Sequence, residues 1–180
     1  MQQWNLIVTV VPGPHHIHDV RSSLGYLGHF WLTSFRDVLI GWTDDTQTLL
    51  QAITEAREKD KRWSHMIGRV IPVQNVFFFT ADSLTEQLKR AVAPLVKEMQ
   101  SGRFYFRLER RGMAGQIPSQ EVEQAVAAHL VSLADDKDIE LTTDFEDPDF
   151  VVAAETIGNE CGVCLLTREL MKQFPFVRPK

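Results

Sequence analysis

Cysteine and long apolar runs are both scarce in this chain of 180 residues. Its two cysteines cannot build a disulfide framework, which favours a reducing, cytoplasmic location. No apolar stretch approaches the roughly 20 residues of a membrane-spanning helix, so we expect no membrane contact. The segment Met1 to Asn5 carries no basic side chain, which argues against a secretory signal. The apolar content of 44% is nevertheless enough for a folded core.

The sequence also lacks the short motifs of common catalytic and cofactor sites. It has no Gly-x-Gly-x-x-Gly dinucleotide fingerprint and no Gly-x4-Gly-Lys-Ser/Thr phosphate loop. The His-x-Glu element of the zinc deaminases and the Gly-x-Ser-x-Gly elbow of serine hydrolases are missing as well. These absences predict a protein that is not an enzyme and that needs no cofactor.

The histidines and cysteines do not combine into a metal-binding pattern. His15, His16 and His18 lie close together, but no cysteine or set of carboxylates accompanies them. Cys161-x-x-Cys164 is half of a zinc pattern with no second half. Residues three apart on a strand point to opposite faces, so two cysteines at this spacing would not chelate one ion. We expect buried structural thiols and no bound metal.

Charge is unevenly placed along the chain. In total, 19 basic residues stand against 24 acidic ones, a net charge of −5, so the protein is not coated uniformly with positive charge for nucleic acid. From Lys89 to Arg111, however, seven basic residues face two acidic ones. From Asp135 to Asp149, eight acidic residues face one lysine. Each block is either a solvated surface or a binding face.

Strand and helix patterns alternate in the first half. Leu6 to Val11 is an apolar, β-branched run that predicts a buried strand, and prolines and a glycine stop it. There follow a helix over 17–27, strands at 30–32 and 38–42, a helix over 49–56 and an extended stretch over 69–79. Pro72 cannot donate to a ladder, so the last strand should lie at an edge or carry a bulge. This β-α-β-β-α-β order predicts a ferredoxin-like domain at residues 1–81.

The second half opens with a helix. Ser83 and Glu86 have the spacing of a capping box, and Pro94 should kink or end that helix. We expect a strand at 103–108, a helix at about 119–133, a short strand at 139–141, and strands at 150–157 and 162–166 joined by a hairpin. These elements predict a second domain at residues 82–180, and the fold class is α/β (α+β).

The strand at 103–108 has two faces of different chemistry. Phe104, Phe106 and Leu108 share one face, and the other carries basic and aromatic side chains that continue into the next residues. The members of this second set are Arg103, Tyr105, Arg107, Arg110 and Arg111. Guanidinium groups pair with phosphates and a tyrosine ring can stack on a base. The same pattern is also typical of a surface that only improves solubility.

The second half resembles a THUMP domain. The resemblance rests on the order of its elements, on the segment 104–112, on Asp147-Pro148-Asp149 and on the run Val151 to Leu166. In that family the THUMP domain follows an N-terminal ferredoxin-like domain, the unit predicted above for residues 1–81. The segment 69–73, followed by a helix, is similar to the junction in the stand-alone THUMP adaptors of tRNA cytidine acetylation.

The resemblance implies a function in RNA binding. THUMP domains bind RNA, chiefly tRNA, and deliver it to a modifying active site. No such active-site domain precedes Lys180, so we expect an adaptor that presents tRNA to a separate modification enzyme such as a cytidine acetyltransferase. The RNA-binding role carries over to Arg103, Arg107, Arg110 and Arg111, and Lys89 and Lys97 would add phosphate contacts.

Two other hypotheses remain open at this point. A protein-interaction module with no RNA ligand would use the acidic 135–149 surface. An enzyme of unrecognised type would use His15, His16 or His129. Salt-sensitive retention of tRNA would separate the adaptor from both, whereas loss of function on chelation would favour a metal enzyme.

Overall fold

The chain divides into two compact units in the computed structural model, which describes residues 3–180. The first unit extends to Val73 and also takes in Met171–Arg178. The second unit comprises Gln74–Leu170 and Pro179–Lys180. Among the helices of residues 3–180, none is long and apolar enough to cross a membrane.

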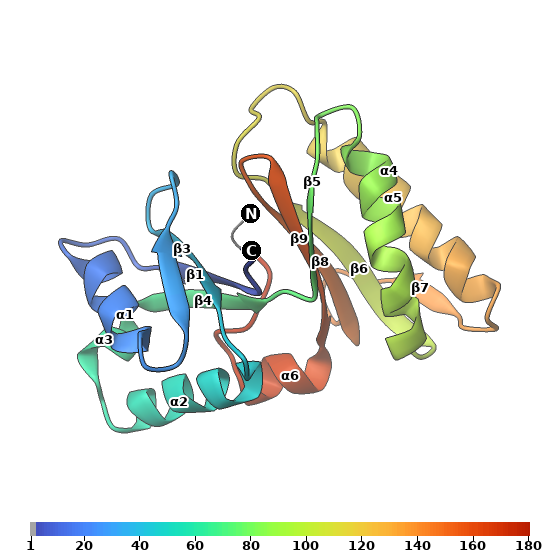
Figure 1. Cartoon of the computed structure of the whole chain (residues 1–180). Coiled ribbons are helices and arrows are strands. Elements are labelled where there is room, and N and C mark those ends of the chain that lie inside the picture. The colour runs from blue at the N-terminus through green and yellow to red at the C-terminus, as the bar shows by residue number, and fades with distance from the viewer. Residues whose placement is uncertain (1–2) are drawn as a thin grey trace. The chain divides into compact units, whose positions relative to one another are not determined.

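The first unit is built on an antiparallel sheet of four strands in the order β2-β3-β1-β4 (Figure 1). Its elements are β1 (Leu6–Val10), α1 (His16–Leu24), β2 (His29–Leu32), β3 (Val38–Trp42), α2 (Thr46–Glu58), α3 (Arg62–His65) and β4 (Ile67–Pro72). Apart from the short α3, this is the β-α-β-β-α-β order expected from the sequence. The first and last strands, β1 and β4, are hydrogen-bonded neighbours in one sheet.

The core of the first unit follows from its hydrophobic patterns. Leu6 and Ile7 in β1 are fully buried, as expected for a central strand with apolar residues on both faces. Helix α2 buries Leu49 and Ile53 at helical spacing. Its first turn is capped by Asp45, whose carboxylate accepts a hydrogen bond from a backbone N–H in that turn at 3.0 Å.

The extended stretch expected over 69–79 consists of two strands in different sheets, so the prediction of a single strand was wrong. Strand β4 ends at Pro72, and β5 (Asn75–Phe78) begins three residues later. The Val73 N–H donates to a carbonyl of the first unit, whereas the Gln74 N–H donates to the Val163 carbonyl of the second. Because β4 is an edge strand, it tolerates Pro72, as the sequence indicated. The units divide at Val73 and Gln74, whereas the sequence placed the junction near residue 81.

The second unit is a five-stranded sheet with helices on one face (Figure 1). Its further elements are α4 (Leu84–Val92), a 3-10 helix η1 (Ala93–Glu98), β6 (Gly102–Glu109), α5 (Ser119–Asp135), β7 (Leu141–Thr143), β8 (Phe150–Ile157), β9 (Glu160–Thr167) and α6 (Arg168–Gln173), the last of which continues into the first unit. The strand order is β5-β9-β8-β6-β7, and β6 runs parallel to both of its neighbours. A mixed α/β fold is thereby confirmed.

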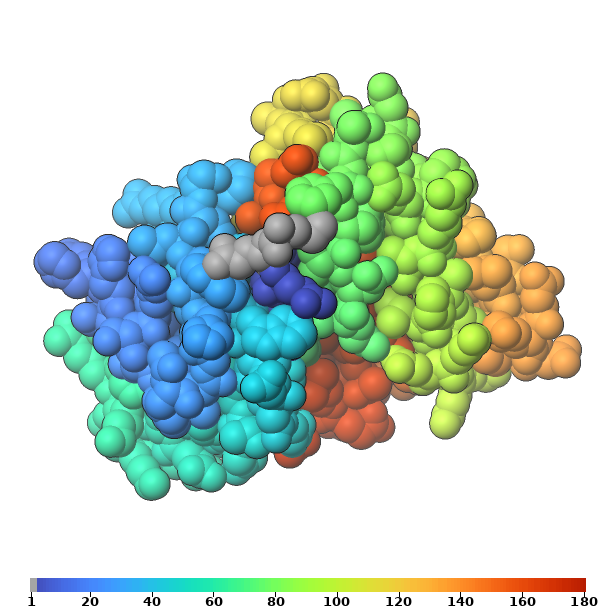
Figure 2. All heavy atoms as spheres, in the orientation of Figure 1, coloured from blue at the N-terminus to red at the C-terminus, as the bar shows by residue number. Residues whose placement is uncertain are grey.

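Helices α4 and α5 pack on the sheet through their apolar stripes. Leu84, Leu88 and Val92 of α4 are fully buried in the core of this unit. The α-helix ends at Val92 and continues as η1, which contains Pro94, because proline cannot donate the next helical hydrogen bond. The outer surfaces of α4 and η1 face the viewer in Figure 2.

Candidate functional site

Strand β6 places its apolar and its basic side chains on opposite faces, as the sequence predicts. Phe104, Phe106 and Leu108 belong to the core beneath the helices, and none of them is more than 5% exposed. The alternate positions, among them Arg103 and Arg107, lie on the opposite face. The local geometry of a single strand therefore brings the cationic and the apolar residues to separate sides.

Arg103 is already paired with carboxylates. Its Nη1 lies 2.6 Å from Asp147, and its Nε lies 3.6 Å from Asp149. A third carboxylate, that of Asp144, lies 4.0 Å from Nη1. Arg168 donates to Asp147 and Asp149 as well. The predicted phosphate-binding charge of Arg103 is thus largely used within the protein.

The same contacts lower the pKa of these carboxyl groups. Hydrogen bonds from Arg168 and then Arg103 hold the pKa of Asp147 below its usual value. The backbone N–H of Arg103 does the same for the pKa of Asp149, and backbone N–H groups in the following turn do so for that of Asp144. These five residues form a cluster of carboxylates and guanidinium groups, which we call the Asp147 cluster.

Tyr105 is less accessible than a stacking platform requires. Its side chain is buried beside Phe145, with 5.3 Å between the ring centroids, and the Arg107 guanidinium lies 5.6 Å from the Tyr105 ring centroid. Phe145 is 63% exposed and offers the open aromatic surface. Phe145 is not among the site residues predicted from the sequence, although it is the one aromatic side chain in the acidic segment 135–149.

Arg107 and Arg110 retain unused donors. Arg107 makes a long ion pair of 3.9 Å with Glu123, and Arg110 donates to the Gly112 carbonyl at 2.6 Å. Within residues 3–180, the Nε of each arginine is buried without a hydrogen-bond partner. These two guanidinium groups are the least committed members of the predicted set on β6 and its continuation.

Arg111 has a structural partner. Its Nη1 lies 2.6 Å from Glu155, and its Nη2 lies 3.9 Å from Glu109. The Arg111 side chain is 11% exposed and that of Glu155 is 2% exposed. Burial of a carboxylate at Glu155 requires such a partner, so this pair ties the end of β6 to β8.

The two lysines predicted to contact phosphate, Lys89 and Lys97, lie on the outer surface of α4 and η1. Lys89 is 2.9 Å from Glu86, one turn earlier on the same helix. Lys97 and Arg90 are exposed. No carboxylate among the described residues lies within ion-pair distance of either cation. Arg90, which was not among the predicted contacts, therefore joins Lys97 as an available positive charge.

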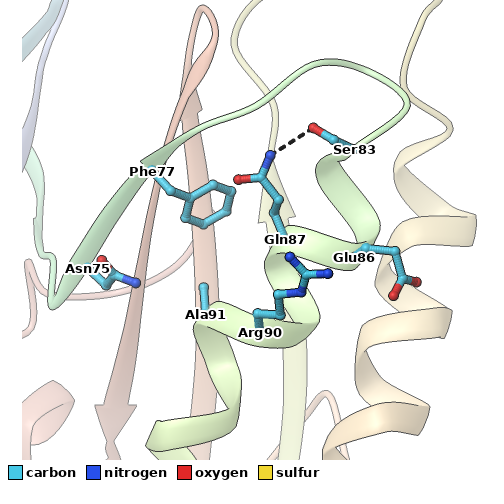
Figure 3. A pocket seen from close by; sticks show the side chains of 7 residues that line it. All are labelled: Asn75, Phe77, Ser83, Glu86, Gln87, Arg90 and Ala91. Atoms are coloured by element: carbon cyan, nitrogen blue, oxygen red, sulfur yellow. Dashed lines mark hydrogen bonds between the residues drawn. The ribbon is translucent and has the colours of Figure 1, made fainter.

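A pocket of about 430 Å³ lies between β5 and α4 beside Arg90. Figure 3 shows the Phe77 ring facing Gln87 and Ala91, with the Arg90 guanidinium on the α4 side. Ser83 does not form the expected capping box, because its hydroxyl bonds to the Thr80 backbone and accepts from the Gln87 amide at 2.8 Å. The pocket therefore combines an aromatic ring, amides and a cation.

The cysteines lie on opposite faces of β9, as their spacing indicates. Cys161 belongs to the core beneath the helices, and Cys164 is buried on the other side of the sheet, beside Ala153 of β8. Burial raises the pKa of both thiols. Among the residues that the structure describes, no group of three or more metal-ligating side chains is placed to hold a metal ion.

Residues 79–166 match the family model of the THUMP domain. This segment lies within the second unit and contains β6, the Asp147 cluster up to Asp149, and the helices α4 and α5. No curated protein matches the sequence.

Solved structures share the fold at low sequence identity. The PH1313 protein of Pyrococcus horikoshii Ot3 aligns over 91% of this chain and 54% of its own, with 10% identity and a TM-score of 0.62. TrmN of Thermus thermophilus aligns over 94% and 48%, with 14% identity and a TM-score of 0.62. A 4-thiouridine synthetase, in a complex with RNA and bound ATP, aligns over 91% and 41%, with 12% identity and a TM-score of 0.56. This chain spans about half the length of the first two.

Proposed function

We propose that this chain binds tRNA as an adaptor, from the premise that residues 79–166 form a THUMP domain. That domain is the observation that carries the proposal, because the THUMP family binds RNA. A 4-thiouridine synthetase that shares the fold was solved with RNA, which supports the same ligand class. We place the RNA on the second unit, at the cations that the protein leaves available.

Two groups of cations fit this role. Arg107 and Arg110 are partly exposed, and Arg107 has only a long ion pair of 3.9 Å with Glu123, so a phosphate oxygen could accept from their terminal N–H groups. Arg90 and Lys97 on α4 and η1 are exposed, no described carboxylate lies within ion-pair distance of either, and Lys89 lies beside them. Electrostatic contacts of this kind position an RNA backbone without reading its sequence.

We assign Arg103, Arg111 and Tyr105 a structural role in the proposed site. The two arginines are paired with carboxylates, so we assign them mainly to the architecture of the site. Tyr105 supports the exposed ring of Phe145 and does not itself offer a free face. All three residues remain predicted RNA contacts, and measurements of RNA binding test them.

We further propose that the chain is not itself an enzyme and that a separate enzyme modifies the bound tRNA. The sequence carries none of the catalytic motifs considered above, and we assign catalysis to a partner such as a cytidine acetyltransferase. The first unit, whose strand order fits a ferredoxin-like domain, would accompany the THUMP domain in this adaptor.

The alternative, a protein-interaction module without RNA, relies on the acidic 135–149 surface. Asp147 and Asp149 are already bound by Arg103 and Arg168, which reduces the free negative charge of that surface. The available cations favour RNA over this alternative as the principal ligand.

Binding of purified tRNA to the Arg107→Ala/Arg110→Ala variant tests the proposal. We expect the wild type to bind tRNA and the variant to bind about tenfold or more weakly, because two guanidinium groups no longer pair with phosphates. Lys137→Ala is the matched control, since it removes an exposed cation from the acidic segment. Wild-type affinity in a well-folded double variant would contradict this placement, and no tRNA binding by the wild type would contradict the function.

A further inference from the structure

A pocket of about 440 Å³ lies beside the edge of β6, on the side of α5. It forms where β7 leaves the sheet, because β7 pairs only with Gly102–Phe104 at the start of β6. Beyond that point β6 has no further strand on this edge among the described residues. The lining residues are Tyr105, Phe106, Gln120, Glu123, Gln124, Ala127, Ala128, Val131, Thr143 and Phe145.

The backbone of Phe106 faces this open edge. Successive residues of a strand direct their backbone groups to alternate edges. Phe104 accepts from the Asp144 N–H at 2.9 Å, and Leu108 donates to the Glu123 carboxylate at 2.8 Å. Phe106 lies between these two residues, so its N–H and C=O point to the same edge of β6. Within residues 3–180, no strand or loop pairs with it there.

A buried residue whose backbone N–H and C=O both lack partners favours a ligand that has a peptide backbone of its own. Phe106 is only 2% exposed, so its N–H and C=O cost free energy when they have no hydrogen-bond partner. An extended peptide offers a carbonyl and an N–H at the right spacing for such an edge. Only a short length of this strand edge is open, because the N–H of Leu108, the next residue that faces the edge, already donates to the Glu123 carboxylate.

The walls of the pocket fit an apolar side chain. Ala127, Ala128 and Val131 form one wall from α5, and Phe145, 63% exposed, stands opposite on its Tyr105 support. An exposed ring beside small aliphatic side chains is typical of an anchor site for a partner residue.

The charge around the pocket is negative. The neighbours of Phe145 in the chain are Asp144 and Glu146, and Glu121 is exposed on the first turn of α5. Arg107 is the cation beside the pocket, and it faces Glu123 at 3.9 Å. A phosphate backbone would be repelled by this rim, whereas lysine or arginine side chains would be attracted.

We propose that this pocket docks an extended segment of a partner protein, in which an apolar anchor residue is flanked by basic residues. The peptide main chain pairs with Phe106, the anchor enters between Phe145 and α5, and the basic flanks meet Asp144 and Glu146. The inference extends the adaptor role proposed above, since it gives the RNA-binding unit a separate surface for a protein.

A synthetic heptapeptide tests the proposal directly on the full-length protein. The probe alternates lysine with apolar residues around a central leucine. Two matched peptides carry either asparagine in place of the central leucine or glutamate in place of every lysine. In amide NMR spectra, we expect the leucine peptide to shift the Phe106 and Phe145 signals and to slow hydrogen exchange at Phe106. Both matched peptides should bind at least about tenfold more weakly. Absence of any shift at Phe106 with the leucine peptide would overturn the proposal.

Two variants show where the peptide binds. Phe145→Ala should weaken binding of the leucine peptide about tenfold or more, and Ala128→Arg should block the pocket from an exposed helix position. Phe78→Ala is the matched control, because Phe78 is a half-exposed phenylalanine on the opposite edge of the same sheet. Equally weakened binding in the control would overturn the assignment.

Titration with tRNA separates this inference from the proposed function. We expect tRNA to bind Phe145→Ala as tightly as it binds the wild type. If Phe145→Ala weakens tRNA binding as much as it weakens binding of the leucine peptide, the pocket belongs to the RNA surface and the proposal is wrong. If the wild type binds the peptide but no tRNA, the RNA function fails while the docking pocket stands.

Discussion

At the scale of single residues, the arginines of the second unit differ in what surrounds them. Arg103 and Arg111 face carboxylates at 2.6 Å, while the carboxylate of Glu123 lies 3.9 Å from Arg107. The partners Asp147 and Glu155 are more than 40 residues away in the chain. Chain-distant partners of this kind decide which guanidinium group can reach a phosphate.

The Asp147 cluster should make stability depend on acid. The folded-state pKa of Asp144, Asp147 and Asp149 is lowered, so the unfolded chain takes up protons first as the pH falls. Their contribution is therefore present above the usual pKa of 3.8 and is lost as the pH drops below it. Urea unfolding followed by circular dichroism between pH 7 and pH 3 measures this. Asp147→Asn should flatten the dependence, and the exposed control Asp135→Asn should not.

Replacement of Arg111 should destabilise the protein more than replacement of Arg107. Arg111→Ala removes the guanidinium group that compensates the buried Glu155 carboxylate, and we expect the free energy of unfolding to fall by about 3 kcal/mol. Arg107→Ala removes a half-exposed, long ion pair, which is worth less than about 1 kcal/mol. Urea unfolding of both variants makes the comparison. Equal stability of the two variants would show that the buried pair contributes no more than the exposed one.

At the scale of elements, the sequence predicts what local periodicity controls. The alternation over 103–108 identified β6 and its two faces, and Pro94 marked the end of α4. The break between β4 and β5 was missed, because both strands are apolar and only sheet pairing separates them. Phe145 and Arg90 were missed as site residues, since their exposure depends on how β7 and α4 pack.

The two cysteines of β9 should be inert in the folded protein. Cys161 and Cys164 are buried on opposite faces, and burial raises the pKa of each thiol, so little thiolate forms at neutral pH. Titration with a thiol-specific disulfide reagent should detect almost no reactive thiol in the native state and two after unfolding. Rapid reaction of either cysteine without unfolding would show that its strand is accessible.

At the scale of the whole molecule, the net charge of −5 conceals two separate surfaces. Asp147 and Asp149 of the acidic segment are bound by Arg103 and Arg168, and Asp144 and Glu146 are the chain neighbours of Phe145 at the pocket. The available cations lie on α4, on η1 and at the end of β6. A protein of this kind can bind RNA through local positive charge while its total charge is negative.

The salt dependence of tRNA binding tests the central claim most directly. Pairing with about four phosphates should give a slope of roughly −3 when the logarithm of affinity is plotted against that of salt concentration. The Arg107→Ala/Arg110→Ala variant should flatten the slope by roughly one unit for each phosphate that it no longer binds, while Lys137→Ala should leave the slope unchanged. Thermal unfolding of each variant confirms that it is folded. A folded double variant that keeps the wild-type affinity and slope would contradict the account.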